Sequence, residues 1–453
     1  MNNWWKLRSL GCIVGLGLAI GLAPQASRAD GVVYVVSGGA GNQTGSDWAN
    51  AKDLQAALQS AASGTEIWVK QGIYLPTAGT DRTVAFTLTN GLNLFGGFAG
   101  TETNRQERNP LQYPSILSGD LLGNDAGAAN DTNPTRSDNS YHVMYCVSKS
   151  EPILIDGFTI RGGQATRLWI PYHIGGGMLI EDCSITLINS HIISNAALTG
   201  GGILNYNTPS HTGSLNISQS IFAGNWAWST GGGLETQQAG IVNLRSTSFV
   251  GNISQQNTVS AIANAGGTLN LHNSIVWGNN GIAPVNGSNN NRNLTVSYSI
   301  VQGGFVGTGN SSNDPQFIDA AGVDNVIGTL DDNVQLQANS AARNAGNTSL
   351  LPTDQTDLDG DGNITESIPF TIDYLPRINE GMVDMGPYEY QGNEPTITPT
   401  PSITPSPTAT ATATPTQTPT ATVMPSETPS PTATNGTPVI PLTNLIYLPA
   451  VTR

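Results

Sequence analysis

The chain has 453 residues, a formal net charge of −15 and 53 glycines, and only 11% of its residues are charged. So little charge is atypical of a helical protein, whereas abundant glycine fits short strands joined by tight turns. The negative charge repels phosphate groups and anionic lipid headgroups, so binding to nucleic acid or to a membrane surface is not expected.

The N-terminal residues have the composition of a secretory signal peptide. An apolar stretch spans residues 10–23, and Ser27 and Ala29 occupy the −3 and −1 positions of a cleavage site. Residues 1–29 are therefore predicted to be removed on export, which places the mature chain in the medium or at the cell surface. A membrane anchor is the alternative, but the apolar stretch is short. We expect no transmembrane span in the mature chain.

Residues 30–140 are predicted to form an N-terminal cap and the first turns of a repeat fold. A strand over residues 32–36 is followed by a helical pattern that opens at Asp47 and ends before Gly64. A short capping helix at this place covers the otherwise exposed first rung of a solenoid.

From residue 141 to 312 the chain repeats one phrase. A glycine cluster is followed by alternating apolar residues and then by Ser/Thr-x-apolar-x-x-Asn. The closing asparagines are spaced by 30, 27 and 27 residues, a period typical of solenoids. Three short alternating strands per period indicate an all-β, single-stranded parallel β-helix. The four closing asparagines are Asn195, Asn225, Asn252 and Asn279.

The positions of the phrase have structural explanations. The apolar residue three places before each asparagine is expected to point inward and to stack on its equivalents. The asparagines fall where the chain turns, so they are expected to tolerate positive φ and to form a hydrogen-bonded ladder along the solenoid. The phrase therefore predicts a fold and no reaction.

Two cysteines, Cys146 and Cys183, follow the predicted signal peptide. Aligning Phe158 with Ser190 in successive repeats places Cys146 over Met178, five residues from Cys183. Export permits a disulfide, but this register favours two unpaired, buried thiols.

The C-terminal part of the chain changes composition twice. Residues 313–390 form an acidic cap, in which renewed alternation over residues 383–390 predicts a closing strand. Residues 391–441 are rich in Pro and Thr and almost uncharged, which predicts a disordered stalk. Residues 442–453 form a short apolar tail.

Two sets of signatures resemble known families. The repeats Gly201-Gly202-Ile203-Leu204 and Phe222-Ala-Gly-Asn225 resemble those of polymorphic outer-membrane proteins, which are β-helix passengers of autotransporters. This chain departs from them in ending in a Pro/Thr stalk without a barrel-like run of strands.

A closer resemblance is to secreted right-handed β-helix proteins with a choice-of-anchor domain, whose fold is pectin lyase-like. Three stretches carry it: Leu94-Phe-Gly-Gly-Phe-Ala-Gly100 with Glu102 and Arg105; Asp314-Pro-Gln-Phe-Ile-Asp319 with Asp331-Asp-Asn333; and Asp357-Leu-Asp-Gly-Asp-Gly362 through Val383-Asp-Met-Gly386 to Glu389. The resemblance implies a right-handed β-helix, export and surface display, and no particular reaction.

One acidic segment resembles the start of a calcium loop. Oxygen-bearing side chains alternate around Gly362, as a loop that wraps one ion requires. The twelfth position, where the bidentate glutamate belongs, holds Ile368, so a solvated acidic loop is the alternative. The candidate calcium ligands are Asp357, Asp359, Asp361, Asn363 and Glu366.

A second candidate site is aromatic. Trp226 and Trp228 are two residues apart, so in an extended segment both rings would face one way and could stack on a sugar, together with Trp169 or Tyr172. The alternative, which we favour, is a corner where the tryptophans pack against the next rung.

The distribution of acids decides between binding and catalysis. Polysaccharide lyases and glycoside hydrolases need clustered carboxylates, or calcium-binding acids beside a base. The rungs carry few acids, and Glu181 and Asp182 are adjacent, so they would face opposite ways in a strand. The sequence thus favours an exported, non-catalytic protein that binds glycans or cell-envelope components, for adhesion or as a structural element. A lyase or hydrolase acting on acidic polysaccharide is the alternative.

Overall fold

The computed structural model describes residues 31–166, 172–209, 211, 213–238, 240–256, 258–281, 283–286 and 293–392. The predicted signal peptide, Trp169, nearly all of the predicted stalk and the apolar tail lie outside these residues. Within them, no helix is long and apolar enough to cross a membrane.

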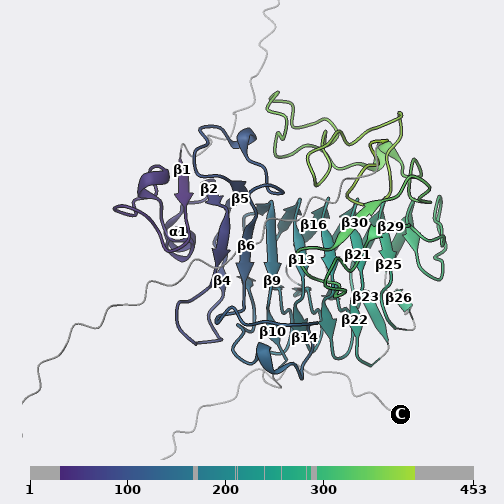
Figure 1. Cartoon of the computed structure of the whole chain (residues 1–453), viewed down its shortest axis with the longest axis horizontal. Helices are drawn as coiled ribbons and strands as arrows, with labels where there is room; N and C mark the ends of the chain where they lie inside the picture. The colour runs from purple at the N-terminus through teal and green to yellow at the C-terminus, as the bar shows by residue number, and fades with distance from the viewer. Residues whose placement is uncertain are drawn as a thin grey trace, which may run out of the picture. The chain divides into compact units, whose positions relative to one another are not determined.

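The chain coils into a right-handed parallel β-helix, as predicted, whose strands stack into parallel sheets (Figure 1). The first sheet, here called sheet A, has β1 (Val32–Val35), β2 (Glu66–Lys70), β5 (Asn93–Phe98), β8 (Ile153–Asp156), β12 (Ile185–Ile188), β16 (Ser214–Ser218), β20 (Ile241–Arg245), β24 (Thr268–His272) and β27 (Asn293–Ser297). Sheet B has β3 (Gly72–Tyr74), β6 (Ser115–Ser118), β9 (Phe158–Arg161), β13 (His191–Ile193), β17 (Ile221–Ala223), β21 (Ser248–Val250), β25 (Ile275–Trp277) and β28 (Ile300–Val301).

The remaining strands of the solenoid complete each rung. Sheet C has β4 (Phe86–Thr87), β7 (Met144–Val147), β11 (Met178–Glu181), β15 (Ile203–Asn207), β19 (Leu234–Gln238), β23 (Val259–Asn264) and β26 (Ala283–Asn286). A fourth sheet, D, has the two-residue strands β10 (Gln164–Ala165), β14 (Ala196–Ala197), β18 (Trp226–Ala227) and β22 (Ile253–Ser254). The expectation of three strands per turn was therefore incomplete, because the residues after each closing asparagine also pair with the next rung.

The glycine clusters precede the strands of sheet C, where successive rungs approach most closely. Gly200 has a φ of +61°, which glycine adopts without strain. Gly201 has a different constraint, because a Cβ atom there would meet the carbonyl oxygens of Trp226 and Gly232 in the next rung, the latter at 2.6 Å. The cluster thus serves both the turn and the contact between rungs.

The interior of the solenoid is apolar, and its residues stack in register. Ile192 pairs with Phe222, and Phe222 with Phe249, whose ring centroids lie 4.4 Å apart with an interplanar angle of 9°. This is the inward stack that the phrase predicts. Burying one such aromatic side chain in each rung favours folding by about 2 kcal/mol.

The closing asparagines form a buried ladder beside this stack. The Nδ2 of Asn195 donates to Oδ1 of Asn225 at 3.1 Å, Asn225 to Asn252 at 2.9 Å, and Asn252 to Asn279 at 2.9 Å. The expectation of positive φ at these asparagines was wrong. The left-handed residue is the one before each of them, for example Gly224 at +61°, which frees the asparagine to turn its amide inward.

The Ser or Thr that begins the Ser/Thr-x-apolar-x-x-Asn part of each repeat forms a second interior ladder, at the corner between sheets A and B. The backbone N–H of Ser190 donates to Oγ of Ser220 at 3.2 Å, and that of Thr247 to Oγ of Ser274 at 3.2 Å. The sheet B strands β13, β17, β21 and β25 are therefore each flanked by two polar ladders, which satisfy backbone groups of the corners.

The N-terminal cap contains the predicted helix, with a later start. Asp47 caps only the 3-10 turn η1 (Trp48–Asn50), and α1 (Leu54–Ser60) begins after its own N-cap, Asp53, whose side chain accepts from the N–H of Gln55. The further 3-10 turns are η2 (Arg105–Glu107), η3 (Pro134–Arg136) and η4 (Thr348–Leu350).

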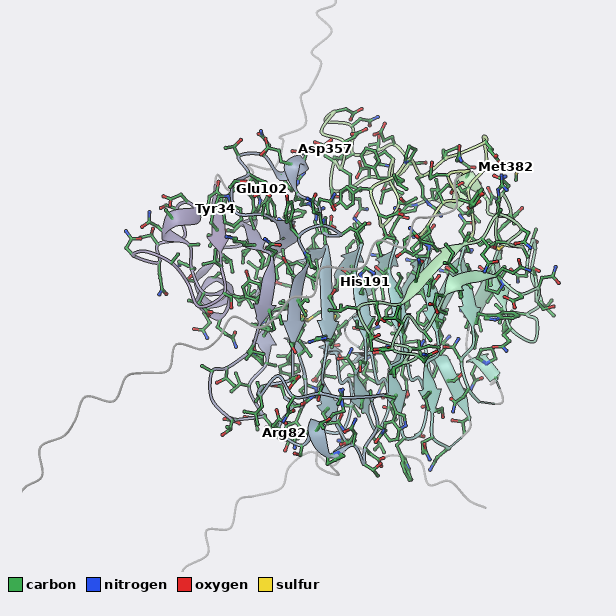
Figure 2. All side chains as sticks on the ribbon, in the orientation of Figure 1. Tyr34, Arg82, Glu102, His191, Asp357 and Met382 are labelled. Atoms are coloured by element: carbon green, nitrogen blue, oxygen red, sulfur yellow. A yellow bond between two sulfur atoms is a disulfide. The ribbon has the colours of Figure 1, made fainter. Side chains whose placement is uncertain are left out.

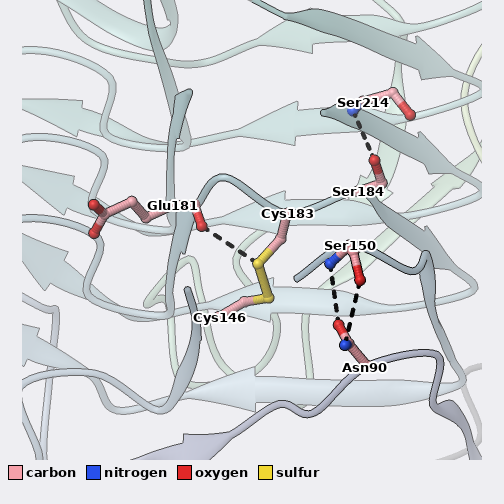
Figure 3. Close-up of a disulfide and its surroundings, with 7 residues drawn as sticks. All are labelled: Asn90, Cys146, Ser150, Glu181, Cys183, Ser184 and Ser214. Atoms are coloured by element: carbon pink, nitrogen blue, oxygen red, sulfur yellow. Dashed lines mark hydrogen bonds between the residues drawn. A yellow bond between two sulfur atoms is a disulfide. The ribbon is translucent and has the colours of Figure 1, made fainter. Parts of the chain in front are cut away.

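Cys146 and Cys183 form a disulfide (Figure 3), contrary to our expectation of free thiols. The predicted register was wrong at this rung, because Cys146 pairs with Ile180 and not with Met178. The turn between β7 and β8, residues 148–152, is two residues longer than the turn between β11 and β12, residues 182–184, so the register of sheet C differs by two residues from that of sheets A and B at this rung. Cys183 then turns the corner after Asp182 and lies with its Cα 6.4 Å from that of Cys146.

Residues 313–392 do not cover the end of the solenoid but lie along its side. The last rung is closed by residues 302–312, where Val301 donates to the carbonyl of Ser311 at 3.0 Å and Phe305 packs against the core. The C-terminal region, defined here as residues 313–392, instead packs Val334 and Ile372 on the outer face of sheet B.

The C-terminal region contains little regular structure. Its β29 (Phe317–Asp319) and β30 (Asn333–Leu336) pair antiparallel. The closing strand predicted over residues 383–390 does not form. Its alternation arises because Val383 and Met385 are buried against other segments of the region and against the rungs, while no neighbouring strand pairs with this stretch.

Candidate binding groove

A groove lies between the outer face of sheet A and the C-terminal region. It has a volume of about 400 Å³, within the range of about 300–1,000 Å³ that is typical of small-molecule sites. Its floor is formed by side chains of β12, β16 and β20, and its wall by residues 349–355. The floor residues are Thr186, Ile188, Asn216, Ile217, Ser218, Asn243 and Arg245.

The floor is polar because alternate residues of each sheet A strand face outward. In β16, Leu215 and Ile217 lie in the core, while Asn216 faces the groove. Asn243 donates to Oδ1 of Asn216 at 2.8 Å, and Asn270 donates to Oδ1 of Asn243 at 2.9 Å. An amide has two N–H donors and two lone pairs, so this outer ladder leaves each asparagine with hydrogen-bonding capacity toward the groove.

Arg245 lies at the edge of the floor, next to His272. They are register neighbours on β20 and β24. Arg245 is half-buried, its guanidinium has no hydrogen bond or ion pair with any described residue, and burial lowers its pKa. The Nδ1 of His272 lies 2.7 Å from Oγ of Ser297, and burial followed by the charge of Arg245 lowers the pKa of His272.

The wall of the groove is held by buried contacts between the C-terminal region and the rungs. The guanidinium of Arg377 is completely buried and donates to Oγ of Ser246 and to Oε2 of Glu389, each at 3.0 Å. Asn273 and Asn347 exchange two hydrogen bonds, at 2.8 and 2.9 Å. These contacts fix residues 349–355 beside sheet A.

The carboxylates of the rungs are engaged elsewhere. Asp156 is buried and accepts from Nη2 of Arg108 at 2.6 Å, and Glu235 accepts from Oγ1 of Thr230 at 2.6 Å. Asp182 binds the N–H of Thr208 at 2.7 Å. Burial and then the neighbouring Asp182 raise the pKa of Glu181. None of these acids lines the groove, so its residues provide no pair of carboxylates for acid–base or nucleophilic chemistry.

The predicted aromatic platform is not assembled. Trp226 is only 3% exposed and packs with Ala129, Ala196 and Ile253, whereas Trp228 is 41% exposed. Their rings are 6.3 Å apart and tilted by 58°, so they offer no common face. The alternative of a packed corner holds for Trp226, because β18 pairs with the rungs on both sides.

Tyr172, a further aromatic candidate, has another partner. Tyr172 packs against Tyr141, with a centroid distance of 4.7 Å. Trp169 lies outside the described residues.

The acidic loop has the oxygen atoms that a hard cation prefers. Carboxylate oxygens of Asp357, Asp359 and Asp361 lie within 4.8 Å of one another, and those of Asp354, Asp359 and Glu366 form a second set. Each of the first three aspartates uses one oxygen to accept a backbone N–H.

The environment of Glu366 also fits a cation. Its Oε1 is buried without a partner among the described residues. Loss of hydration, followed by the charges of Asp361 and Asp359, raises its pKa. The side-chain N–H of Asn363 donates to Glu366, and its side-chain oxygen accepts from the hydroxyl of Thr365. Both polar atoms of the Asn363 side chain are therefore engaged within the loop. Ile368, at the twelfth position of the loop, is buried beside Ile188, so this position contributes to packing.

The acidic loop also contacts the segment that follows β5; Figure 2 shows Asp357 near Glu102 of that segment. The Nε2 of Gln106 donates to the carbonyl of Asp357 at 3.2 Å. Arg105 reaches the carbonyl of Thr356 at 2.5 Å and forms an ion pair with Glu66 at 2.7 Å. The loop therefore ties the C-terminal region to the first rungs.

Sequence reasoning missed the groove and Arg245. One signal was available, because a polar residue recurs every 27 residues at the centre of the sheet A strands, as in Asn216, Asn243 and Asn270. The wall, however, comes from residues about one hundred positions later, and no local pattern indicates that they fold back here.

Comparisons with known proteins give little further information. No family model matches the chain, and no curated protein matches it. One similar solved structure is described as the crystal structure of pectate lyase Pel9A. It shares 13% sequence identity, covers 80% of this chain and 96% of its own, and has a TM-score of 0.38. This similarity is too slight to bear on function.

Proposed function

We propose that this chain is an exported, surface-displayed β-helix protein that binds glycans of its surroundings or of the cell envelope without transforming them. The observation that carries the proposal is the groove on sheet A. Its floor and wall offer hydroxyl, amide and guanidinium groups and no carboxylate. Such a lining can hydrogen-bond sugar hydroxyls but lacks the acids that glycoside hydrolysis or calcium-assisted elimination requires.

Export is supported by two features. The N-terminal segment has the composition of a signal peptide, and the chain resembles choice-of-anchor proteins in three stretches. The disulfide between Cys146 and Cys183 agrees with an oxidising compartment, because such bonds rarely persist in the cytosol.

Calcium has a structural role in this proposal. The ion would be held by Asp357, Asp359 and Asp361, with Glu366 completing the site, and would neutralise crowded carboxylates where the loop meets the first rungs. We expect calcium to raise the melting temperature of the full chain, and chelator to lower it.

The calcium prediction has a matched control. Asp359 belongs to both acidic sets, so Asp359→Asn should abolish the calcium effect. Asp314→Asn, which removes an exposed acid outside the loop, should leave it intact. A melting temperature that does not respond to chelator would contradict a structural ion.

The binding proposal is tested with the full chain on a glycan array, combined with a turnover assay on polyuronides. We expect saturable binding to a subset of glycans and no product formation. Steady release of unsaturated or shortened sugars would show an enzyme, and absence of any glycan binding would reject the proposal.

A further inference from the structure

We propose that the groove on sheet A selects an acidic sugar, whose carboxylate or sulfate group binds the guanidinium of Arg245. This inference rests on the proposed glycan-binding function and specifies its ligand class. It assigns the anion contact to one residue and the sugar contacts to the uncharged side chains around it.

The first argument is the isolation of Arg245 in an acidic protein. Five other described arginines form ion pairs with carboxylates: Arg105 binds Glu66, Arg108 binds Asp156, Arg136 binds Asp125, Arg343 binds Glu380 and Arg377 binds Glu389. Arg245 has none among the residues that the structure describes, although the chain has a net charge of −15. A half-buried guanidinium has lost part of its hydration, so an external anion would find five N–H donors in a planar, carboxylate-matching arrangement.

The second argument is the position of Arg245 within the groove. It follows Asn243 by two residues on β20, so both side chains leave the same face of the sheet. Asn216 and Thr186 continue the row of polar groups across the two preceding strands. Neighbouring strands are about 4.8 Å apart, so this row is about 10 Å long. A ligand anchored at Arg245 would therefore extend along a line of hydroxyl and amide groups.

The opposite wall supplies further uncharged polar groups. Ser349, Thr353 and Gln355 line the groove and are largely exposed. Asp354 lies between two of these residues, but its Oδ2 is occupied by the N–H of Leu358 at 2.8 Å and its side chain is buried. The wall thus adds hydrogen-bonding groups without placing a carboxylate against the bound anion.

The charge of the groove limits the ligand further. His272 is the register neighbour of Arg245 on β24, and burial, followed by the charge of Arg245, lowers its pKa and so favours its neutral form. One cation among neutral polar groups suits a sugar with one acidic substituent per binding unit. A phosphate backbone would meet the repulsion of the remaining net negative charge, so nucleic acid is disfavoured.

The test measures binding to the full chain by calorimetry with three probes that share one backbone. They are a galacturonic acid tetrasaccharide, its carboxyl-reduced neutral form, and the neutral form bearing sulfate. We expect at least one of the two acidic probes to bind at least tenfold more tightly than the neutral form. Comparison of the two acidic probes shows whether the carboxylate or the sulfate is preferred.

Variants assign the preference to Arg245. Arg245→Gln should remove the advantage of the acidic probe, and Arg245→Lys should keep part of it. Arg343→Gln changes the net charge equally but removes an exposed partner of Glu380 outside the groove, so it should have no effect. Melting temperatures of all variants show that they remain folded.

The outcomes separate this inference from the proposed function. Equal affinity for acidic and neutral probes, unchanged in Arg245→Gln, would overturn the anion contact but leave glycan binding standing. A preference for the acidic probe that survives in Arg245→Gln would also overturn it. Failure of all probes, together with failure on the glycan array, would reject both proposals.

Discussion

The rungs and the C-terminal region are built on different principles although they pack together. In the rungs, each residue contacts its equivalent one repeat away, so that Phe222 lies on Phe249 and Asn225 on Asn252. In the C-terminal region, cohesion depends on single buried groups such as Arg377, which bind several segments at once. The stability of the solenoid therefore arises from many similar contacts, whereas that of the C-terminal region depends on a few buried residues.

The strongest test of this difference is Arg377→Met. Removing one partner of a buried ion pair costs about 3–5 kcal/mol, because the other charge stays buried. We expect the C-terminal region to lose protection in hydrogen exchange around β30 while the rungs keep theirs, and sugar binding to disappear because the groove loses its wall.

The control for this variant is Arg343→Met, which breaks a surface pair with Glu380 and should cost less than about 1 kcal/mol. Simultaneous loss of protection in the rungs and in the C-terminal region of Arg377→Met would show that the two do not unfold separately.

The second test compares two asparagine ladders within the same rungs. Asn225 is fully buried, and its side chain makes four hydrogen bonds, to Asn195, Ile192 and Asn252. Asn225→Ala should cost about 4 kcal/mol, since several buried groups lose their partners. Asn243→Ala on the outer ladder should cost less than about 1 kcal/mol, because water replaces the lost amide.

Denaturant unfolding followed by tryptophan fluorescence measures both variants. Similar losses in Asn225→Ala and Asn243→Ala would mean that burial of the ladder contributes nothing beyond its pairwise hydrogen bonds.

The third test concerns the disulfide, which joins two rungs across a corner. Its closed loop spans 37 residues, and removing such a cross-link costs about 3–4 kcal/mol through the entropy of the unfolded chain. Reducing agent should therefore lower the midpoint of unfolding of the native protein. It should have no effect on the double variant Cys146→Ala/Cys183→Ala. An unchanged midpoint after full reduction would contradict the expected stabilisation.

The same contrast explains what could be predicted from the sequence. Periodicity revealed the β-helix and its inward stack, because a repeated contact leaves a repeated residue such as Phe249. The disulfide was missed because the turn after β7 is two residues longer than the turn after β11, so the register of sheet C differs from the one that an alignment of β9 with β13 gives.

The candidate site was harder to predict than the fold. Arg245 carries no motif, and the wall beside it depends on Arg377 binding Ser246 across 131 residues. The acidic loop could be predicted because its candidate ligands lie within a few residues of one another in the sequence. Val383 to Tyr390 alternates without forming a strand, since its residues serve contacts with several segments rather than one neighbour.

We expect pH to have the smallest effect on stability. The sign of this effect differs between the rungs and the C-terminal region. In the rungs, burial lowers the pKa of His142 to about 4, below its unfolded value of 6.5. The unfolded chain then binds the extra proton, so stability is lost as pH falls from about 6.5 toward 4. His142→Asn should reduce this acid sensitivity, as measured by melting temperatures between pH 4 and 8.

In the C-terminal region the sign reverses at Asp332. Burial raises the pKa of Asp332 from 3.8 to about 7, and the charges of Asp331 and Asp324 add to this increase. The hydrogen bond from the N–H of Gly328 has the opposite effect and lowers the pKa. The folded state then holds the extra proton, so stability is lost as pH rises from about 4 through 7. Asp332→Asn should stabilise the C-terminal region by about 1–2 kcal/mol at pH 8, less than the shift implies because Asp332 keeps some contact with water. It should be neutral at pH 4, and a gain that is equal at both pH values would show that the ionisation of Asp332 is not its cause.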